Sequence, residues 1–187
     1  MNKTIYLAGG CFWGMEHLMQ KIEGVIDATS GYANGTCEAD ATYKVVCTGA
    51  TNFKETVRVI YDDSKVCLEQ LLLIYFYVIH PEQRNRQAND IGTQYQTGIY
   101  YIDQETKEIV ERIYRLEKSF HKEFFVEKGP LINFFEAEEY HQDYLVKNPN
   151  GYCHIPLNMI EVISKVKIKP SDYNRKAQDI INDLLVK

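Results

Sequence analysis

The hydrophobic positions of this 187-residue chain follow two spacings. Short apolar or alternating runs, typical of β-strands, occur at residues 4–8, 25–31, 43–47, 56–61 and 98–102. Apolar positions three and four apart, typical of amphipathic helices, occur in the segment that ends at Gly24 and at residues 68–79, 104–124, 137–145 and 171–185. Ser171 is the expected cap of the last helix, and residues 161–168 are expected to be extended. This mixed order of strands and helices predicts a single α+β domain.

The strongest local signal lies between the first strand and the first helix, where residues 9–14 read GGCFWG. Cys11 therefore lies near the first turn of a helix, where free N–H groups and the helix dipole favour negative charge. We expect this position to lower the pKa of Cys11, with Phe12 and Trp13 forming an apolar wall beside a reactive thiolate. The alternative from the residues alone is a buried cysteine that only fills the core.

Composition and charge narrow the classes of function. With 45% hydrophobic and 25% charged residues, the chain can bury a sizeable core. Its net charge of −5 favours neither nucleic acid nor a membrane as a partner. The run at residues 71–79 is shorter than the roughly 20 residues that span a bilayer, and the run before Cys11 is too short for a signal peptide. We therefore expect a cytoplasmic protein.

The cysteines are odd in number and contain no CxxC pair, which argues against both a disulfide framework and a zinc site. They are Cys11, Cys37, Cys47, Cys67 and Cys153. Cys153 follows a flexible Asn-Pro-Asn-Gly turn and could move toward an oxidised sulfur to form a disulfide, or it could be an idle surface thiol. Glu138 and His141 have the spacing of a carboxylate-histidine metal motif, but a single copy favours a hydrogen-bonding or packing role.

Other candidate residues are a possible acid and possible hydrogen-bond donors. Glu55 precedes an apolar strand, where partial burial would raise its pKa; the alternative is a surface glutamate. Tyr43 and Tyr95 could donate hydrogen bonds to an oxygen, although fourteen tyrosines make neither distinctive. Asp90 lies in a polar loop at residues 80–96, where it could serve a site or merely form a turn.

Taken together, these segments resemble the peptide methionine sulfoxide reductase A family over roughly residues 4–156. The matching motifs are GGCFWG at 9–14, GYANG at 31–35, TY and VC at 42–43 and 46–47, NRQANDIGTQY at 85–95, AEEYHQDY at 137–144 and NPNGYC at 148–153. We accordingly expect a mixed β-sheet flanked by helices around a ferredoxin-like core. Residues 1–156 would form the catalytic domain, and residues 157–187 an extension whose last helix packs back on it.

The resemblance implies a role for each matching residue. Cys11 would attack the sulfoxide sulfur of methionine-S-sulfoxide, free or in proteins, and become a sulfenic acid. Phe12 and Trp13 would hold the methyl group of the substrate. Glu55 would protonate the sulfoxide oxygen, helped by hydrogen bonds from Tyr43 and Tyr95, with Asp90 in the surrounding polar network. Cys153 would form a disulfide with Cys11. Thioredoxin, or dithiothreitol in its place, would reduce that disulfide without any cofactor, and we expect a monomer.

The chain also departs from the family pattern. Residues 52–54 read Asn-Phe-Lys where Gly-His-Ala is usual, so Lys54 could weaken Glu55 as an acid if their side chains met. Adjacent strand residues point to opposite faces, so we expect little contact between them. No cysteine follows Cys153, which implies that the reductant attacks its disulfide directly. Two other functions stay open, a thiol peroxidase and a non-catalytic redox-sensing module.

Overall fold

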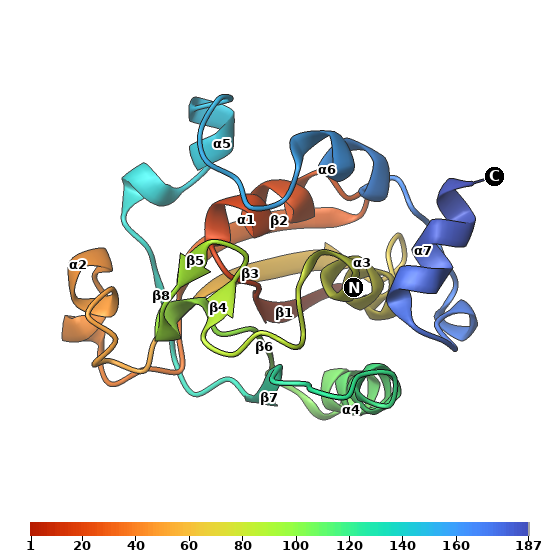
Figure 1. Ribbon diagram of the computed structural model, residues 1–187, viewed down its shortest axis with the longest axis horizontal. Coiled ribbons are helices and arrows are strands. Elements are labelled where there is room, and N and C mark those ends of the chain that lie inside the picture. The colour runs from red at the N-terminus through yellow and green to blue at the C-terminus, as the bar shows by residue number, and fades with distance from the viewer. Residues whose placement is uncertain (187) are drawn as a thin grey trace.

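The computed structural model describes residues 1–186, and its main element is one six-stranded mixed sheet (Figure 1). The strand order is β7-β6-β1-β3-β2-β8. The strands are β1 (Asn2–Ala8), β2 (Val25–Ala33), β3 (Lys54–Asp62), β6 (Gly98–Tyr101), β7 (Glu127–Pro130) and β8 (Phe134–Glu136). A separate ribbon pairs the short strands β4 (Arg86–Gln87) and β5 (Asp90–Ile91).

Seven α-helices accompany the sheet among the described residues. They are α1 (Phe12–Gln20), α2 (Tyr43–Val46), α3 (Leu68–Val78), α4 (Gln104–Lys118), α5 (Tyr144–Lys147), α6 (Leu157–Ile163) and α7 (Ala177–Leu185). None of the helices in residues 1–186 combines the length and apolar character that crossing a bilayer requires.

The expected ferredoxin-like core is confirmed. The elements β1-α1-β2-β3-α3-β6 follow one another along the chain, and their strands are ordered β6-β1-β3-β2 with antiparallel neighbours. Side chains alternate between the two faces of each strand, so residues two apart lie on the same face of the sheet. The face covered by α1 and α3 holds fully buried residues from the two central strands, Ile5 and Leu7 of β1 and Val57 and Val59 of β3. The helix α3 is buried along most of its length, because α4 and α7 cover its outer side.

The sequence prediction was wrong for residues 43–47, which form the short helix α2 instead of a strand. Strands β2 and β3 pair directly with each other, so the segment between them has no place in the sheet. The N–H of Val46 donates to the Thr42 carbonyl at 2.8 Å, closing a helical turn. The β-branched Val45 and Val46 gave the segment its strand-like pattern.

Several boundaries also differ from those expected. The region 161–168 is not extended at its start, because α6 continues to Ile163 and buries Ile160 and Ile163 three residues apart. Residues 137–145 form a 3₁₀ turn (Glu139–His141) and α5, separated by Asp143 with φ of 54°. The helix α4 ends at Lys118.

The C-terminal residues pack against the core, as expected. Helix α7 lies beside α3 (Figure 1) and buries Ala177, Ile180 and Ile181. The Glu117 carboxylate on α4 holds the start of α7 in place. It accepts hydrogen bonds from the Tyr173 hydroxyl at 2.8 Å and from the Ala177 N–H at 2.7 Å. Ser171 is not the cap of this helix; it lies in a separate 3₁₀ turn (Pro170–Asp172), and the helix begins after Lys176.

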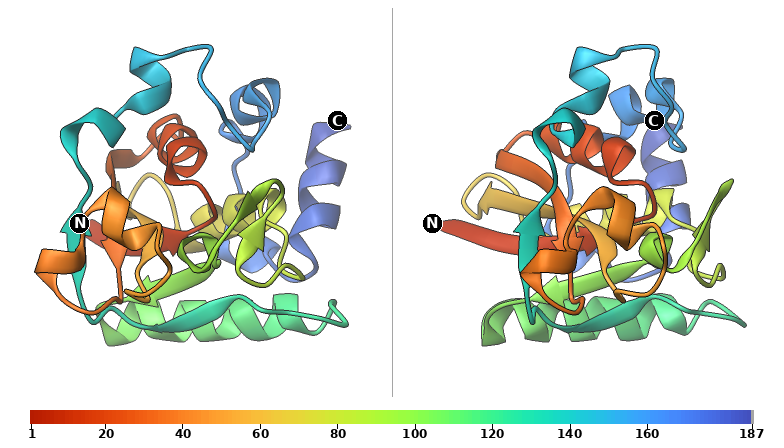
Figure 2. Two further views of the ribbon diagram at one scale, coloured as in Figure 1. Left: turned by 60° about the vertical axis from the view of Figure 1, so that its left-hand side comes forward. Right: turned by 90° about the vertical axis from the view of Figure 1, so that its left-hand side faces the viewer.

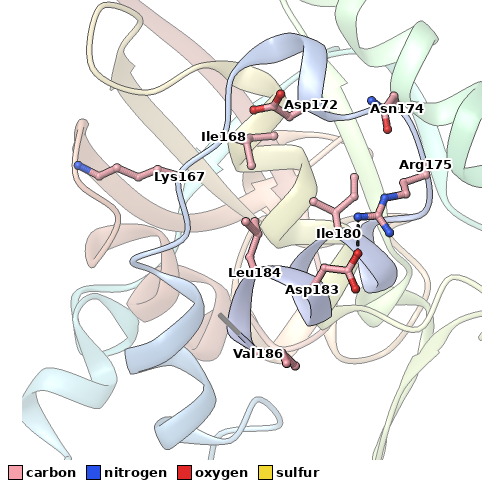
Figure 3. A pocket seen from close by; sticks show the side chains of 9 residues that line it. All are labelled: Lys167, Ile168, Asp172, Asn174, Arg175, Ile180, Asp183, Leu184 and Val186. Carbon is pink, nitrogen blue, oxygen red and sulfur yellow. Dashed lines mark hydrogen bonds and ion pairs between the residues drawn. The ribbon is translucent and has the colours of Figure 1, made fainter.

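An open depression with a volume of about 570 Å³ lies between α7 and the segment before it (Figure 3). An ion pair at 2.5 Å between Arg175 and Asp183 borders it. None of its lining residues belongs to the predicted site. The two views in Figure 2 show α4 and β7 along the lower side of the molecule.

Truncating a buried side chain on α7 should destabilise the whole domain. Ile181→Ala removes a fully buried group, so we expect a loss of about 2–5 kcal/mol and a melting midpoint lower by roughly 5–15 °C. Thermal unfolding followed by circular dichroism measures this. Gln178→Ala on the exposed face of the same helix is the control. Equal midpoints for both variants would mean that α7 adds nothing to the core.

Candidate active site

Cys11 is the N-cap of α1 and lies directly after the end of β1, as the sequence predicts. Gly10 has φ of 84°, a conformation that suits glycine, and lets the chain turn from strand to helix. A Cβ on Gly10 would lie only 2.7 Å from the Gln87 side chain, so the β4-β5 ribbon packs directly on this turn. The Cys11 side chain is 6% exposed and is a free thiol.

The expected lowering of the Cys11 pKa is wrong. Burial raises the pKa of this thiol well above its ordinary value, and the charge of Glu55 raises it further. A backbone N–H, that of Trp13, acts in the other direction but does not compensate. The stabilisation that a helix terminus gives to a charge is small compared with the cost of removing a thiolate from water.

Glu55 lies beside Cys11 and is 2% exposed. It accepts the N–H of Phe12, the first residue of α1, at 3.1 Å on Oε2. Burial raises the pKa of Glu55 to about 8; the Phe12 N–H opposes this, whereas the charges of Asp90 and Glu138 add to it. The shift has the expected direction, and it keeps the carboxyl protonated at pH 7.

Lys54 does not contact Glu55, as the alternation of strand residues predicts. Its Nζ donates to Asn52 Oδ1 at 3.1 Å and lies 3.4 Å from Glu127 Oε2, on the other face of the sheet. Asn52 has φ of 60°, which explains how asparagine replaces the usual glycine there. Phe53 is buried against Phe135. The unusual residues 52–54 therefore leave the surroundings of Glu55 intact.

The two aromatic residues after Cys11 differ in accessibility. Phe12 is 1% exposed and lies with its ring between those of Tyr32 and His141, at centroid distances of 5.8 and 5.1 Å. Trp13 is half-buried, and Tyr144 of α5 stacks on it at 3.7 Å. Of the pair, Trp13 has the accessible surface, whereas Phe12 supports the wall from within.

Tyr43, Tyr95 and Asp90 come to the same place from separate segments. Tyr43 begins α2 and Tyr95 ends a 3₁₀ turn (Thr93–Tyr95). The pKa of each tyrosine is raised, first by burial and then by charges that include Glu55 and Cys11. Asp90 on β5 accepts the hydroxyl of Tyr152 at 3.0 Å. All three residues thus surround the Cys11 and Glu55 pair.

Cys153 lies over the first turn of α1. Its Sγ is 2.9 Å from the position that a Cβ on Gly14 would occupy, so only glycine leaves room for it. Its thiol is free, half-buried and close enough to influence Cys11, and burial raises its pKa. This arrangement places the Cys153 thiol near Cys11, beside which the buried Glu55 carboxyl lies.

Comparisons with known proteins decide the family. The model of the peptide methionine sulfoxide reductase family matches residues 3–172. The chain belongs to this family. Methionine sulfoxide reductase A of Corynebacterium diphtheriae is 37% identical over 81% of this chain and 77% of its own, with a TM-score of 0.71.

Two structures of Mxr1 from Saccharomyces cerevisiae are also similar. The reduced form is 36% identical over 83% of this chain and 90% of its own, with a TM-score of 0.75. The form in complex with Trx2 is 25% identical over 76% of this chain and 84% of its own, with a TM-score of 0.53. These matches confirm the expected methionine sulfoxide reductase A enzyme and its fold. The division of the chain at residue 156 stays a prediction.

In this reductase, Glu138 and His141 have the hydrogen-bonding role that the sequence favoured, but sequence reasoning did not place them in the site. Glu138 Oε1 accepts the N–H of Tyr43 at 2.9 Å, and the ring of His141 accepts the indole N–H of Trp13 on Nδ1 at 3.1 Å. This leaves Nε2 as the protonated nitrogen, 3.4 Å from Glu138 Oε2. The two residues therefore fix Trp13 and α2, and within residues 1–186 no cluster suited to a metal ion includes them. Their Glu-x-x-His spacing was the available signal.

Proposed function

We propose that this reductase acts on methionine-S-sulfoxide, free or in proteins, and that Cys11 and Glu55 carry out the chemistry. The observation that supports this most strongly is the buried Glu55 carboxyl, bonded to the first N–H of α1 next to Cys11. A carboxyl with a pKa of about 8 holds its proton at pH 7 and can donate it to the sulfoxide oxygen.

The first step conserves atoms and electrons. The Cys11 sulfur attacks the sulfoxide sulfur while Glu55 protonates the oxygen and then takes up the thiol proton. The sulfur–oxygen bond of the substrate breaks, the oxygen is transferred to Cys11, and methionine is released. Cys11 is thereby oxidised to a sulfenic acid and methionine sulfoxide is reduced. The high pKa of Cys11 suits this order, because the thiol remains protonated until proton donation to the substrate leaves Glu55 as a carboxylate that can accept the thiol proton.

Phe12 and Trp13 would bind the methyl group of the substrate. Because Phe12 is enclosed, we assign the direct contact to the exposed part of Trp13, whose orientation the His141 hydrogen bond fixes. Tyr43 and Tyr95 would donate hydrogen bonds to the sulfoxide oxygen, and Asp90 would complete the polar side. A fixed wall and a fixed donor set can distinguish the two sulfoxide epimers, which need separate enzymes.

Cys153 would then attack the sulfenic acid, forming a Cys11–Cys153 disulfide and releasing water. The complex of Mxr1 with Trx2 supports a thioredoxin as the protein that reduces this disulfide. The five free cysteines accord with a cytoplasmic location, where thiols stay reduced. The proposal includes a monomer without a prosthetic cofactor, whose catalytic residues lie within residues 1–156.

The epimers of methionine sulfoxide test the proposal. We expect turnover of the S epimer with dithiothreitol, none of the R epimer, and loss of activity in Cys11→Ser. Methionine release is measured by chromatography, and mass mapping of the oxidised protein should show the Cys11–Cys153 pair. Consumption of the R epimer, undiminished activity of Cys11→Ser, or faster turnover of hydrogen peroxide than of sulfoxide would each contradict it.

A further inference from the structure

The imidazole of His154 has no role in the chemistry described above, yet it lies against the turn that carries Cys11. It follows Cys153 in the segment between α5 and α6. Both ring nitrogens are buried, and neither makes a hydrogen bond of ordinary geometry within residues 1–186, although the ring lies near enough to the Gly9 carbonyl for that oxygen to raise its pKa. A buried polar group without partners is costly, so a histidine that only fills space would be a poor choice here.

The position of His154 is defined by two glycines on either side of Cys11. Its Nε2 lies 3.5 Å from the place of a Cβ on Gly10, and its Nδ1 lies 3.5 Å from the corresponding place on Gly14. The Cys153 Sγ approaches the same point on Gly14 at 2.9 Å. The imidazole therefore spans the turn that carries Cys11 and reaches the first helical turn on which the Cys153 sulfur lies.

The protonation state of His154 suits a base. Burial lowers its pKa and His80 lowers it further, whereas Asp90 and the Gly9 carbonyl raise it without reversing the shift. The ring is therefore neutral at pH 7 and has a free lone pair. The Cys153 thiol faces the opposite difficulty, because burial and Asp90 raise its pKa and leave little thiolate. The imidazole and the Cys153 sulfur approach the same point on Gly14 without a hydrogen bond between them, and a neutral imidazole that comes within hydrogen-bond distance of a protonated thiol can activate it as a nucleophile.

We propose that His154 takes the thiol proton of Cys153 as its sulfur attacks the sulfenic acid of Cys11, and returns that proton to the departing hydroxyl. The sulfur–sulfur bond forms while the sulfur–oxygen bond of Cys11 breaks. Cys153 is oxidised, Cys11 is reduced, and the hydroxyl leaves as water with the proton that the thiol lost. The step needs no further reactant, and it rests on the proposed function, in which Cys153 resolves Cys11.

The test separates methionine release from disulfide formation. His154→Asn keeps a polar side chain but cannot act as a base in this pH range. After one addition of methionine-S-sulfoxide without reductant, rapid quenching gives methionine by chromatography and free thiols by alkylation and mass analysis. We expect disulfide formation to slow about 100-fold more than methionine release does, within the range typical of general acid–base catalysis. His17→Asn on α1 is the control and should match the unaltered protein.

The pH dependence distinguishes a proton acceptor from a packing residue. Without the base, disulfide formation in His154→Asn should rise with pH as Cys153 ionises by itself, and approach the rate of the unaltered protein at alkaline pH. A rate reduced by the same factor at every pH, or unchanged, would overturn the role of His154. Cys153→Ser tests the underlying function separately. If Cys11 forms a disulfide with a different cysteine in this variant, the resolving role of Cys153 is wrong.

Discussion

Replacing Glu55 with glutamine should lower the rate of methionine release by about 10²–10⁴-fold, the usual contribution of a general acid. Glutamine keeps the size of the side chain and an oxygen that accepts the Phe12 N–H, so the start of α1 should hold its place. What is lost is the proton that the buried carboxyl carries at pH 7. Single-turnover release of methionine from the S epimer measures the effect, and Glu139→Gln at an exposed position is the control. A loss of less than tenfold would exclude Glu55 as the acid.

The same carboxyl should set the alkaline limit of the reaction. Because the pKa of Glu55 is raised to about 8, the rate in the unaltered protein should be level below this pH and fall above it. The fall should be absent from Glu55→Gln, which has no proton to lose. A pH profile of single-turnover rates from pH 6 to 10 would show both results.

The free energy of unfolding should also depend on pH through the Glu55 carboxyl. A carboxyl whose pKa is about 8 when folded and near 4.5 when unfolded binds more protons in the folded state between these values. The free energy of unfolding therefore decreases as pH rises through this window, by about 1.4 kcal/mol per pH unit. Glu16, whose pKa burial raises to about 7, adds a similar slope to both proteins. Glu55→Gln should thus be the more stable protein at pH 8, by several kcal/mol in urea denaturation.

Local pattern was enough to predict the turn that holds Cys11. Alternation in β1, two glycines and the helical spacing of Leu18, Met19 and Ile22 are all encoded within twenty residues, and the structure has the expected strand, turn and helix. The sheet order then follows from chain connectivity, because a βαββαβ arrangement closes one apolar face with two helices.

The errors arose where distant contacts override local preference. Tyr43 begins a helix, and its N–H donates a hydrogen bond to the carboxylate of Glu138, which lies 95 positions further along the chain. The two valines after it have strand propensity, but no neighbouring strand is available to pair with them. The predicted direction of the Cys11 pKa shift was wrong for a related reason. The helix terminus is visible in the sequence, whereas burial by the β4-β5 ribbon and by residues 153–154 is not.

The same limit explains why Glu138 and His141 were not recognised as parts of the site. Their spacing is visible, but their partners Tyr43 and Trp13 lie about one hundred or more residues away in the chain. The segment from Glu138 to His154 returns across α1 and contributes residues that meet Trp13, Asp90 and Gly14. The residues of a site assembled in this way can be identified from sequence motifs. Which of them contact one another can be known only from the folded structure.

Replacing Cys153 with serine should separate the first turnover from all later ones. The variant should release about one methionine per chain, because Cys11, Glu55 and Trp13 remain in place. Continuous turnover with thioredoxin should then fall at least about 100-fold. The reason is access: Cys11 is 6% exposed and its pKa is raised, so a protein reductant cannot readily reach a sulfenic acid at this depth.

Cys153 solves this problem because it is half-buried and belongs to a segment with an adjacent Asn-Pro-Asn-Gly turn. Its sulfur already lies on the first turn of α1, so forming the disulfide transfers the oxidising equivalent outward to a more accessible residue. Dithiothreitol is small enough to enter, and it should restore part of the turnover of Cys153→Ser. Cys37→Ser, which alters an exposed thiol, should behave as the unaltered protein with either reductant. Undiminished thioredoxin-dependent turnover of Cys153→Ser would mean that the sulfenic acid of Cys11 is reduced without Cys153, and that its burial does not protect it.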